Sequence, residues 1–151
     1  VVYQLQPGEV LSIESENILA FTPDCKYDVR FIGCGVISQK GLATSTLTGT
    51  GPNAYVAILI DGNPIVLSNI QTGSTLVVDP DAVVCWMGNG YCDPDIKMDV
   101  NWKTFIGQTS GESYSFEWNA RQPVTVIIQP NERASGISLG MDGGRLGHRP
   151  N

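Results

Sequence analysis

The sequence predicts an all-β protein, an antiparallel sandwich with at most one short helical turn. Short apolar or alternating runs recur between turn signals along the chain, which is the spacing expected of β-sandwiches and barrels. The 151 residues include 17 glycines and 9 prolines, so turns are frequent. No segment carries a sustained apolar stripe of helical period, so long amphipathic helices are not expected.

The N-terminal strands are bounded by clear turn signals. The first apolar run ends at Pro7-Gly8, and the polar segment ESEN (14–17) predicts a hairpin turn between the next two strands. YDVRFI alternates apolar and charged residues, and AYVAILI is so apolar that we expect it to be buried on both faces. The predicted strands are VVYQLQ (1–6), EVLSI (9–13), ILAFT (18–22), YDVRFI (27–32), LATSTLT (42–48) and AYVAILI (54–60).

The C-terminal strands follow the segment DGNP (61–64), which is the strongest hairpin signal in the chain because it combines Asp-Gly with Asn-Pro. Further turns are expected at QTGS (71–74) and at Asp79-Pro80-Asp81, and a single helical turn near Trp102–Ile106. The predicted strands are IVLSNI (65–70), TLVVDP (75–80), AVVCWM (82–87), IKMDVNW (96–102), SYSFEW (113–118) and VTVIIQP (124–130).

These strands are expected to build one β domain over residues 1–135, followed by a flexible Gly/Arg-rich tail over residues 136–151. A faint internal repeat relates residues 47–61 to residues 116–130 with an offset of 69. Its matched inward positions are predicted to be Tyr55, Ala57 and Leu59 in the first unit and Val124, Val126 and Ile128 in the second. The repeat suggests two structurally related halves.

The charge balance argues against several kinds of partner. The chain has 9 basic and 15 acidic residues, a net charge of −6, and no basic cluster that would neutralise nucleic-acid phosphates or an anionic membrane. No apolar run approaches the roughly 18 residues that span a bilayer, so direct membrane insertion is not expected. We expect a cytoplasmic location, or a mitochondrial one if a targeting segment preceding Val1 was removed.

The four cysteines, Cys25, Cys34, Cys85 and Cys92, lack C-x₂-C spacing and a nearby histidine, which disfavours a zinc site. They are interpreted as reduced, partly buried thiols. In an oxidising compartment a disulfide is the alternative, with Cys85 and Cys92 as the favoured pair.

No metal or cofactor is expected. The single histidine, His148, lies in the tail and cannot supply the several imidazoles of a β-helix metal enzyme. Asp93, Asp95 and Asp99 loosely resemble a calcium loop but lack its central glycine and closing glutamate, so we interpret them as a solvated loop. No glycine-rich nucleotide fingerprint follows a strand.

Catalysis is not expected either. Residues 107–111 (GQTSG) differ from a nucleophile elbow because Ser110 lies one position late and strands, not a helix, follow. The only histidine is in the tail, and a dyad of Ser110 with Lys103 is disfavoured. We interpret Thr109, Ser110 and Gly111 as a polar turn, followed by a strand whose residues 114, 116 and 118 face inward.

Several stretches together resemble the altered-inheritance-of-mitochondria 24 family. They are YDVRF (27–31), GLATSTLTGTG (41–51), AYVAILIDGNPIVL (54–67), LVVDPDAVVCW (76–86), DVNWKTFIGQTSGESYSFEW (99–118) and VTVIIQP (124–130). The resemblance covers roughly residues 7 to 133. The chain departs from the family pattern at residues 118–121, where WNAR replaces a glycine-rich approach, and after Gly33, where the segment is shorter.

This resemblance implies a fold similar to the tryptophan RNA-binding attenuation protein, an antiparallel double-stranded β-helix that often assembles by edge pairing. It implies no known enzyme activity, no catalytic residues and no defined ligand. We therefore expect a non-catalytic assembly or scaffold module. A protein partner is a further expectation, as is a homo-oligomer formed through sheet edges, with the uncharged runs 1–6 and 124–130 as the outer strands. The alternative is a small-ligand-binding domain that uses a concave face with Trp86 or Trp118.

Overall fold

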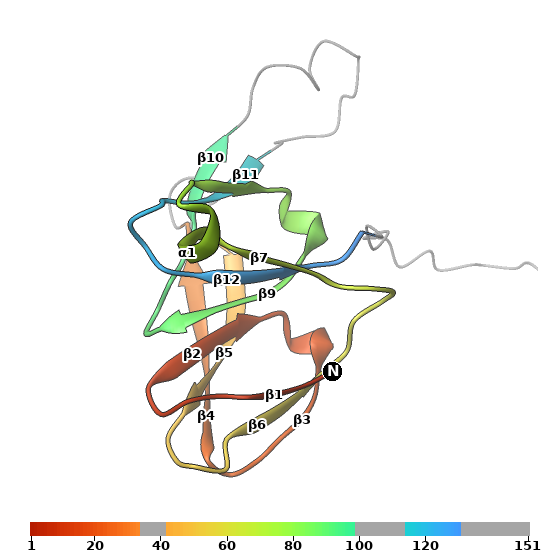
Figure 1. Ribbon diagram of the computed structural model, residues 1–151. Coiled ribbons are helices and arrows are strands. Elements are labelled where there is room, and N and C mark those ends of the chain that lie inside the picture. The colour runs from red at the N-terminus through yellow and green to blue at the C-terminus, as the bar shows by residue number, and fades with distance from the viewer. Residues whose placement is uncertain (34–41, 99–113, 131–151) are drawn as a thin grey trace, which may run out of the picture.

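The computed structural model describes residues 1–33, 42–98 and 114–130 (Figure 1). Its strands form three antiparallel sheets, which confirms the predicted all-β class. One sheet has the order β4-β5-β2-β9-β12-β7, and two smaller sheets have the orders β1-β6-β3 and β10-β11-β8. The elements are β1 (Val2–Gln4), β2 (Glu9–Ile13), η1 (Ser15–Asn17), β3 (Ile18–Phe21), β4 (Cys25–Ile32), β5 (Leu42–Gly49), β6 (Tyr55–Ile58), β7 (Ile65–Ser68), α1 (Asn69–Thr72), β8 (Leu76–Val78), η2 (Pro80–Ala82), β9 (Val83–Asn89), β10 (Asp95–Met98), β11 (Tyr114–Trp118) and β12 (Thr125–Ile128).

The chain folds as two halves with the same strand topology, drawn from red to yellow and from green to blue in Figure 1. The first half pairs its strands as β4-β5-β2 and β1-β6-β3, and the second pairs the corresponding strands as β10-β11-β8 and β7-β12-β9. Equivalent backbone bonds close the halves: the Leu59 N–H donates to the Asn17 carbonyl (2.8 Å) and the Gln129 N–H to the Ala82 carbonyl (2.9 Å). Antiparallel pairing of β2 with β9 joins the halves into one large sheet.

The internal repeat predicted between residues 47–61 and 116–130 corresponds to β5–β6 and β11–β12, which hold equivalent places in the two halves. The predicted inward positions of the first unit are wrong by one residue. Val56 is fully buried, whereas Tyr55 is 38% exposed. Because a shift of one residue turns every side chain of a strand to its other face, Val56 is the counterpart of Val126, and the offset is one residue longer than predicted.

Two hydrophobic cores lie on opposite faces of the large sheet. From Cys85 to Met87, the side chains of β9 alternate between them, because Cys85 and Met87 belong to the first core and Trp86 to the second. The first core packs the large sheet against β1-β6-β3, and the second packs it against β10-β11-β8. The fully buried side chains of the first core include Leu11, Ile13, Leu47, Val56 and Ile58, and those of the second include Trp118, Val124 and Val126.

Two expectations about strand position are wrong. The uncharged run 124–130 was expected at an edge, but β12 lies inside the large sheet between β9 and β7. Its lack of charge reflects burial, since Val126 and Ile127 face the two cores. The run 54–60 was expected to be buried on both faces, but β6 alternates, with Val56 buried and Tyr55 exposed.

Two predicted hairpin turns connect strands of different sheets instead. The segment ESEN contains the 3₁₀ turn η1, which carries the chain from β2 in the large sheet to β3 in a small one. DGNP links β6 to β7, and these strands also belong to different sheets, so this turn connects the two halves. A turn signal marks where the chain reverses but does not fix the partner of the next strand. The hairpin-paired neighbours are β4–β5 and β10–β11.

The helical content of the described residues is one short helix and two 3₁₀ turns. Helix α1 occupies the end of the run predicted as the strand IVLSNI, and Gly73 ends it in the left-handed conformation with φ of 64°. The helical turn predicted near Trp102–Ile106 lies outside the described residues. Within the described part of the chain, no helix is long and apolar enough to cross a bilayer.

Candidate functional site

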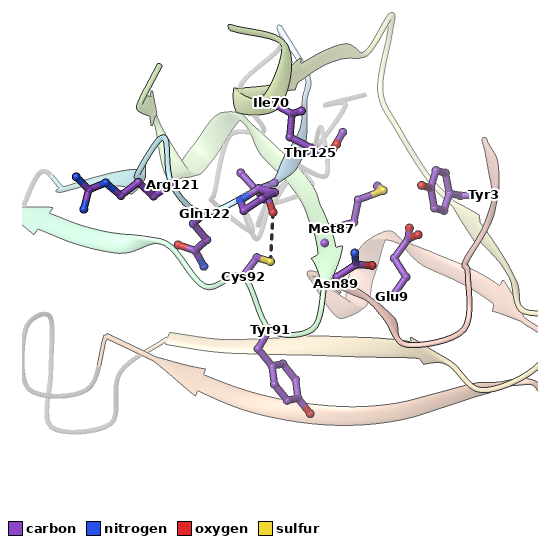
Figure 2. Close-up of a pocket in the computed structure, with 13 residues that line it drawn as sticks. Tyr3, Glu9, Ile70, Met87, Asn89, Tyr91, Cys92, Arg121, Gln122 and Thr125 are labelled. Atoms are coloured by element: carbon purple, nitrogen blue, oxygen red, sulfur yellow. Dashed lines mark hydrogen bonds between the residues drawn. The ribbon is translucent and has the colours of Figure 1, made fainter. Parts of the chain in front are cut away.

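A cavity of about 510 Å³ lies where the two halves meet. Its wall combines Tyr3 of β1 and the start of β2 from the first half with the end of β9 and the β11–β12 loop from the second (Figure 2). The β2–β9 pairing places Glu9 directly opposite Asn89, so this register brings the first half to the mouth of the cavity. The volume falls within the range of about 300–1,000 Å³ that is typical of small-molecule sites.

One end of the cavity is acidic. Tyr3 and Glu9 lie together there (Figure 2). Burial, followed by a hydrogen bond with the Glu9 side chain, raises the pKa of Tyr3 from 10.0 to about 12. The phenol is therefore protonated at neutral pH and acts as the donor in this hydrogen bond. The Glu9 Oε1 atom is buried, and no group in the described part of the chain donates a hydrogen bond to it.

The opposite end is polar and basic. Arg121 and Gln122 lie on the β11–β12 loop, across the cavity from Glu9 (Figure 2). The loop turns tightly, because the Arg121 N–H donates to the Asn119 side chain (3.0 Å). Arg121 is exposed and forms no ion pair with any residue that the structure describes.

Between the two ends, the wall of the cavity is closely packed around Cys92 and includes the apolar side chains of Met87 and Val124. The Cys92 thiol lies 3.6 Å from the Pro123 carbonyl, the only hydrogen bond drawn between the residues of Figure 2. A side chain at position 88 has no room, because a Cβ atom on Gly88 would lie 2.4 Å from the Cys92 sulfur. Burial, with a smaller effect of Asp93, raises the pKa of the Cys92 thiol. The sulfur is therefore a neutral wall atom at neutral pH.

The tryptophans considered as ligand contacts are part of the second core. Trp118 is 0% exposed, and its indole N–H donates to the Cys92 carbonyl (2.8 Å). Trp86 packs against Trp118 and Phe116 with ring centroids 5.7 and 6.0 Å apart. Neither tryptophan lines the cavity between the halves. The residues that do line it were missed, because nothing in the sequence indicates that Glu9, Cys92 and Arg121 line one cavity.

The acidic loop after β9 is engaged in an ion pair. Asp93, expected to be solvated, pairs with Arg30 of β4, and the Arg30 guanidinium also stacks 3.6 Å from the centre of the Tyr91 ring. Asp95 begins β10, and Asp99 lies outside the described residues. Over residues 1–33, 42–98 and 114–130, no three His, Cys, Asp or Glu residues come close enough to hold a metal ion.

Part of the segment 99–118 is described. Tyr114–Trp118 forms β11, and Phe116 and Trp118 face the core with Tyr114 packed against it, as the alternation predicted. Lys103, Ser110, Gly111 and His148 lie outside the described residues, so the polar-turn interpretation stays a prediction.

The described cysteines are free buried thiols. Cys85 belongs to the first core and Cys92 to the second, so the favoured disulfide pair is separated by the large sheet. Cys25 is a third buried thiol, in the first core, and Cys34 lies outside the described residues.

The free energy of unfolding is expected to fall as the pH rises above the ordinary thiol pKa. Burial raises the pKa of Cys85 from 9.0 to about 12. The unfolded chain therefore loses this proton first, so the stabilisation is complete below pH 9.0 and is lost as the pH rises toward 12. Urea midpoints measured from neutral to alkaline pH should decline less steeply in Cys85→Ala than in the wild type. Cys25→Ala is the matched thiol deletion, and the same slope in wild type and Cys85→Ala would contradict the prediction.

An exposed apolar row marks the outer edge of the large sheet. β4 is an edge strand, and its residues Tyr27, Val29 and Phe31 are 44%, 46% and 61% exposed on one face. Phe21 of β3 extends this row by stacking on Tyr27, with ring planes at 9° and centroids 6.1 Å apart. A groove of about 330 Å³ runs beside the row and is lined by Tyr27, Val29 and, on its acidic side, Glu14.

Together these features define an all-β sandwich protein with an internal repeat, a cavity between the halves and an apolar edge. The chain belongs to the AIM24 family, because the family model described as mitochondrial biogenesis AIM24 matches residues 1–131. This match confirms the resemblance drawn from the sequence.

A solved structure has a similar fold. The crystal structure of protein SPYM3_0169 from Streptococcus pyogenes is similar to this chain with a TM-score of 0.61 and 20% sequence identity. The similarity covers 87% of this chain and 54% of the other, so this chain spans about half the length of that protein. A comparison with curated proteins finds no match.

Proposed function

We propose that this protein is a non-catalytic assembly module whose copies associate through the apolar row on β4. The observation that carries the proposal is the exposure of Tyr27, Val29 and Phe31 in one row on an edge strand. Large apolar side chains gathered on one surface mark interaction sites in soluble proteins. Only 16% of the residues are charged, so few charges protect this surface from contact.

The proposed occupant of this surface is a second copy of the chain. In a twofold dimer, the same patch supplies both sides of the contact, so each β4 row would face the β4 row of its partner. The groove beside the row offers space for the partner's Phe31 ring. Aromatic side chains seated in such grooves supply much of the binding energy of protein interfaces.

Side-chain packing, more than extension of the sheet, would hold this contact. The Asp28 carboxylate accepts the Val29 N–H at 2.8 Å, so one backbone donor of β4 is already engaged. Charged side chains that cover an edge in this way discourage strand addition. The edge assembly expected from the sequence is therefore proposed here in a refined form, with the face of β4 as the contact.

The cellular role of this module is proposed at the level of the family. The description of that family as one of mitochondrial biogenesis supports a scaffold role in mitochondria, and a cytoplasmic scaffold is the corresponding role where no targeting takes place. We also propose that the chain is a double-stranded β-helix that assembles like the tryptophan RNA-binding attenuation protein. A further protein partner would bind the assembled module.

Val29→Lys is expected to convert the assembly to a monomer of 16.3 kDa in light scattering. A twofold contact contains the substitution twice, so a cost of roughly 1.4 kcal/mol at each copy weakens association about a hundredfold. Val77→Lys is the matched control, because Val77 is 62% exposed on β8, away from the row. A wild-type mass of 16.3 kDa at every concentration, or equal dissociation by both variants, would refute the proposed contact.

A further inference from the structure

We propose that the cavity between the halves binds a small zwitterion, with an ammonium group at Glu9 and a carboxylate at Arg121, joined by an aliphatic chain. This ligand class goes beyond the assembly function, because the cavity shares no lining residue with the apolar row on β4. It also differs from a ligand held by Trp86 or Trp118, which do not line the cavity.

The ammonium position follows from the unsatisfied oxygen of Glu9. Tyr3 engages the Glu9 carboxylate, while the Glu9 Oε1 atom is buried and no described residue donates a hydrogen bond to it. A buried acceptor without a donor is costly, and an ionised one more so. An ammonium group supplies both the missing N–H donors and the opposite charge, so it satisfies this end better than a neutral hydroxyl or amide would.

The connecting chain follows from the middle of the cavity. Met87, Cys92 and Val124 line this part, and Gly88 leaves the floor without a side chain. These side chains carry no charge, so an uncharged chain of methylene groups can pack against them between the two ends. The thioether of Met87 adapts readily to the shape of an aliphatic ligand.

The carboxylate position follows from Arg121. Arg121 lines the end of the cavity remote from Glu9, and its side chain is exposed, has no acidic partner among the described residues, and extends outward from the loop in Figure 2. A guanidinium binds a carboxylate through two parallel N–H donors. Because the two charged residues are separated and opposite in sign, a ligand with a single charge satisfies only one end.

Titration calorimetry with straight-chain ω-amino acids, from γ-aminobutyrate to ε-aminocaproate and longer, tests the proposal on the full chain. We expect one chain length to bind best, and the alkylamine and alkanoate of that length to bind at least about tenfold more weakly. Glu9→Gln should weaken the best ligand by about tenfold or more, because it removes a charged hydrogen bond. The matched control is Glu16→Gln, which removes an exposed acid on η1 and should leave binding unchanged.

A second variant keeps the test decisive if Glu9→Gln folds poorly, since Glu9 begins β2. Arg121→Gln changes an exposed loop side chain, and it should weaken the ω-amino acid to the level of the alkylamine while leaving alkylamine binding unchanged. The proposal is overturned if no member of the series binds at millimolar concentration. It is equally overturned if a folded Glu9→Gln or Arg121→Gln binds the zwitterion as the wild type does, which would show that the substituted charge does not hold the ligand.

Discussion

Replacing Trp118 by alanine is expected to destabilise the fold by about 3–5 kcal/mol, the range for removing a large buried aromatic side chain. Among the residues that the structure describes, Trp118 is the largest fully buried side chain, and it packs edge-on against Phe116, with ring planes at 86° and centroids 6.0 Å apart. Its loss also removes the indole donor to the Cys92 carbonyl. Since domains are stable by about 5–15 kcal/mol in total, this one substitution consumes a large share of the stability.

Urea unfolding followed by circular dichroism measures this loss of stability. The Trp118→Phe variant separates the contribution of ring packing from that of the indole hydrogen bond. Phenylalanine retains a ring in the second core but cannot donate to Cys92, so we expect a smaller cost of roughly 1–3 kcal/mol, which includes the carbonyl left without a partner. Leu19→Ala, at an exposed position of β3, should stay within about 0.5 kcal/mol of the wild type. A Trp118→Ala variant as stable as Leu19→Ala would show that the second core is not packed as described.

The strands were predictable from the sequence, but their pairing was not. Alternation placed Phe116 and Trp118 in the core correctly, because side-chain direction follows directly from the period of a strand. The segments ESEN and DGNP correctly predicted where the chain turns. Their flanking strands pair elsewhere, since pairing depends on how whole sheets pack and not on the turn alone.

The same limit explains the error over the run 124–130. An uncharged strand at the end of a domain has the composition of an unprotected edge and also that of a strand inside a sheet. The β12 pairings with β7 and β9 decide between them. The true apolar edge, β4, was less conspicuous because Lys26, Asp28 and Arg30 alternate with its aromatic and aliphatic residues.

The cavity between the halves carried no signal in the sequence. Glu9 and Arg121 are brought to it by the β2–β9 pairing and by a loop that Asn69 fixes from a distant part of the chain. Such a site arises from tertiary structure, and only the internal repeat hinted that two halves would meet. The halves are equivalent in topology but not in sequence, which lets each contribute a different charge to the shared cavity.

Asn69→Asp is expected to destabilise the protein by roughly 3 kcal/mol or more at neutral pH, although it changes the side chain by a single group. Asn69 is buried, and its amide nitrogen donates to the carbonyls of Asn119 (3.0 Å) and Gln122 (2.5 Å), while its oxygen accepts the Val124 N–H (2.9 Å). Aspartate has no N–H group to donate to the two carbonyl oxygens, and each lost hydrogen bond costs about 1–3 kcal/mol. It also places a buried negative charge next to these oxygens.

The matched control is Asn63→Asp, which makes the same change of charge at an exposed turn position and should cost about 0.5 kcal/mol or less. Lowering the pH should partly restore the stability of Asn69→Asp, because a protonated carboxyl group regains one donor toward the loop carbonyls. Urea midpoints at neutral and acidic pH measure both effects. If Asn69→Asp and Asn63→Asp are equally stable at neutral pH, the Asn69 side chain does not hold the β11–β12 loop, and the placement of Arg121 at the cavity loses its structural cause.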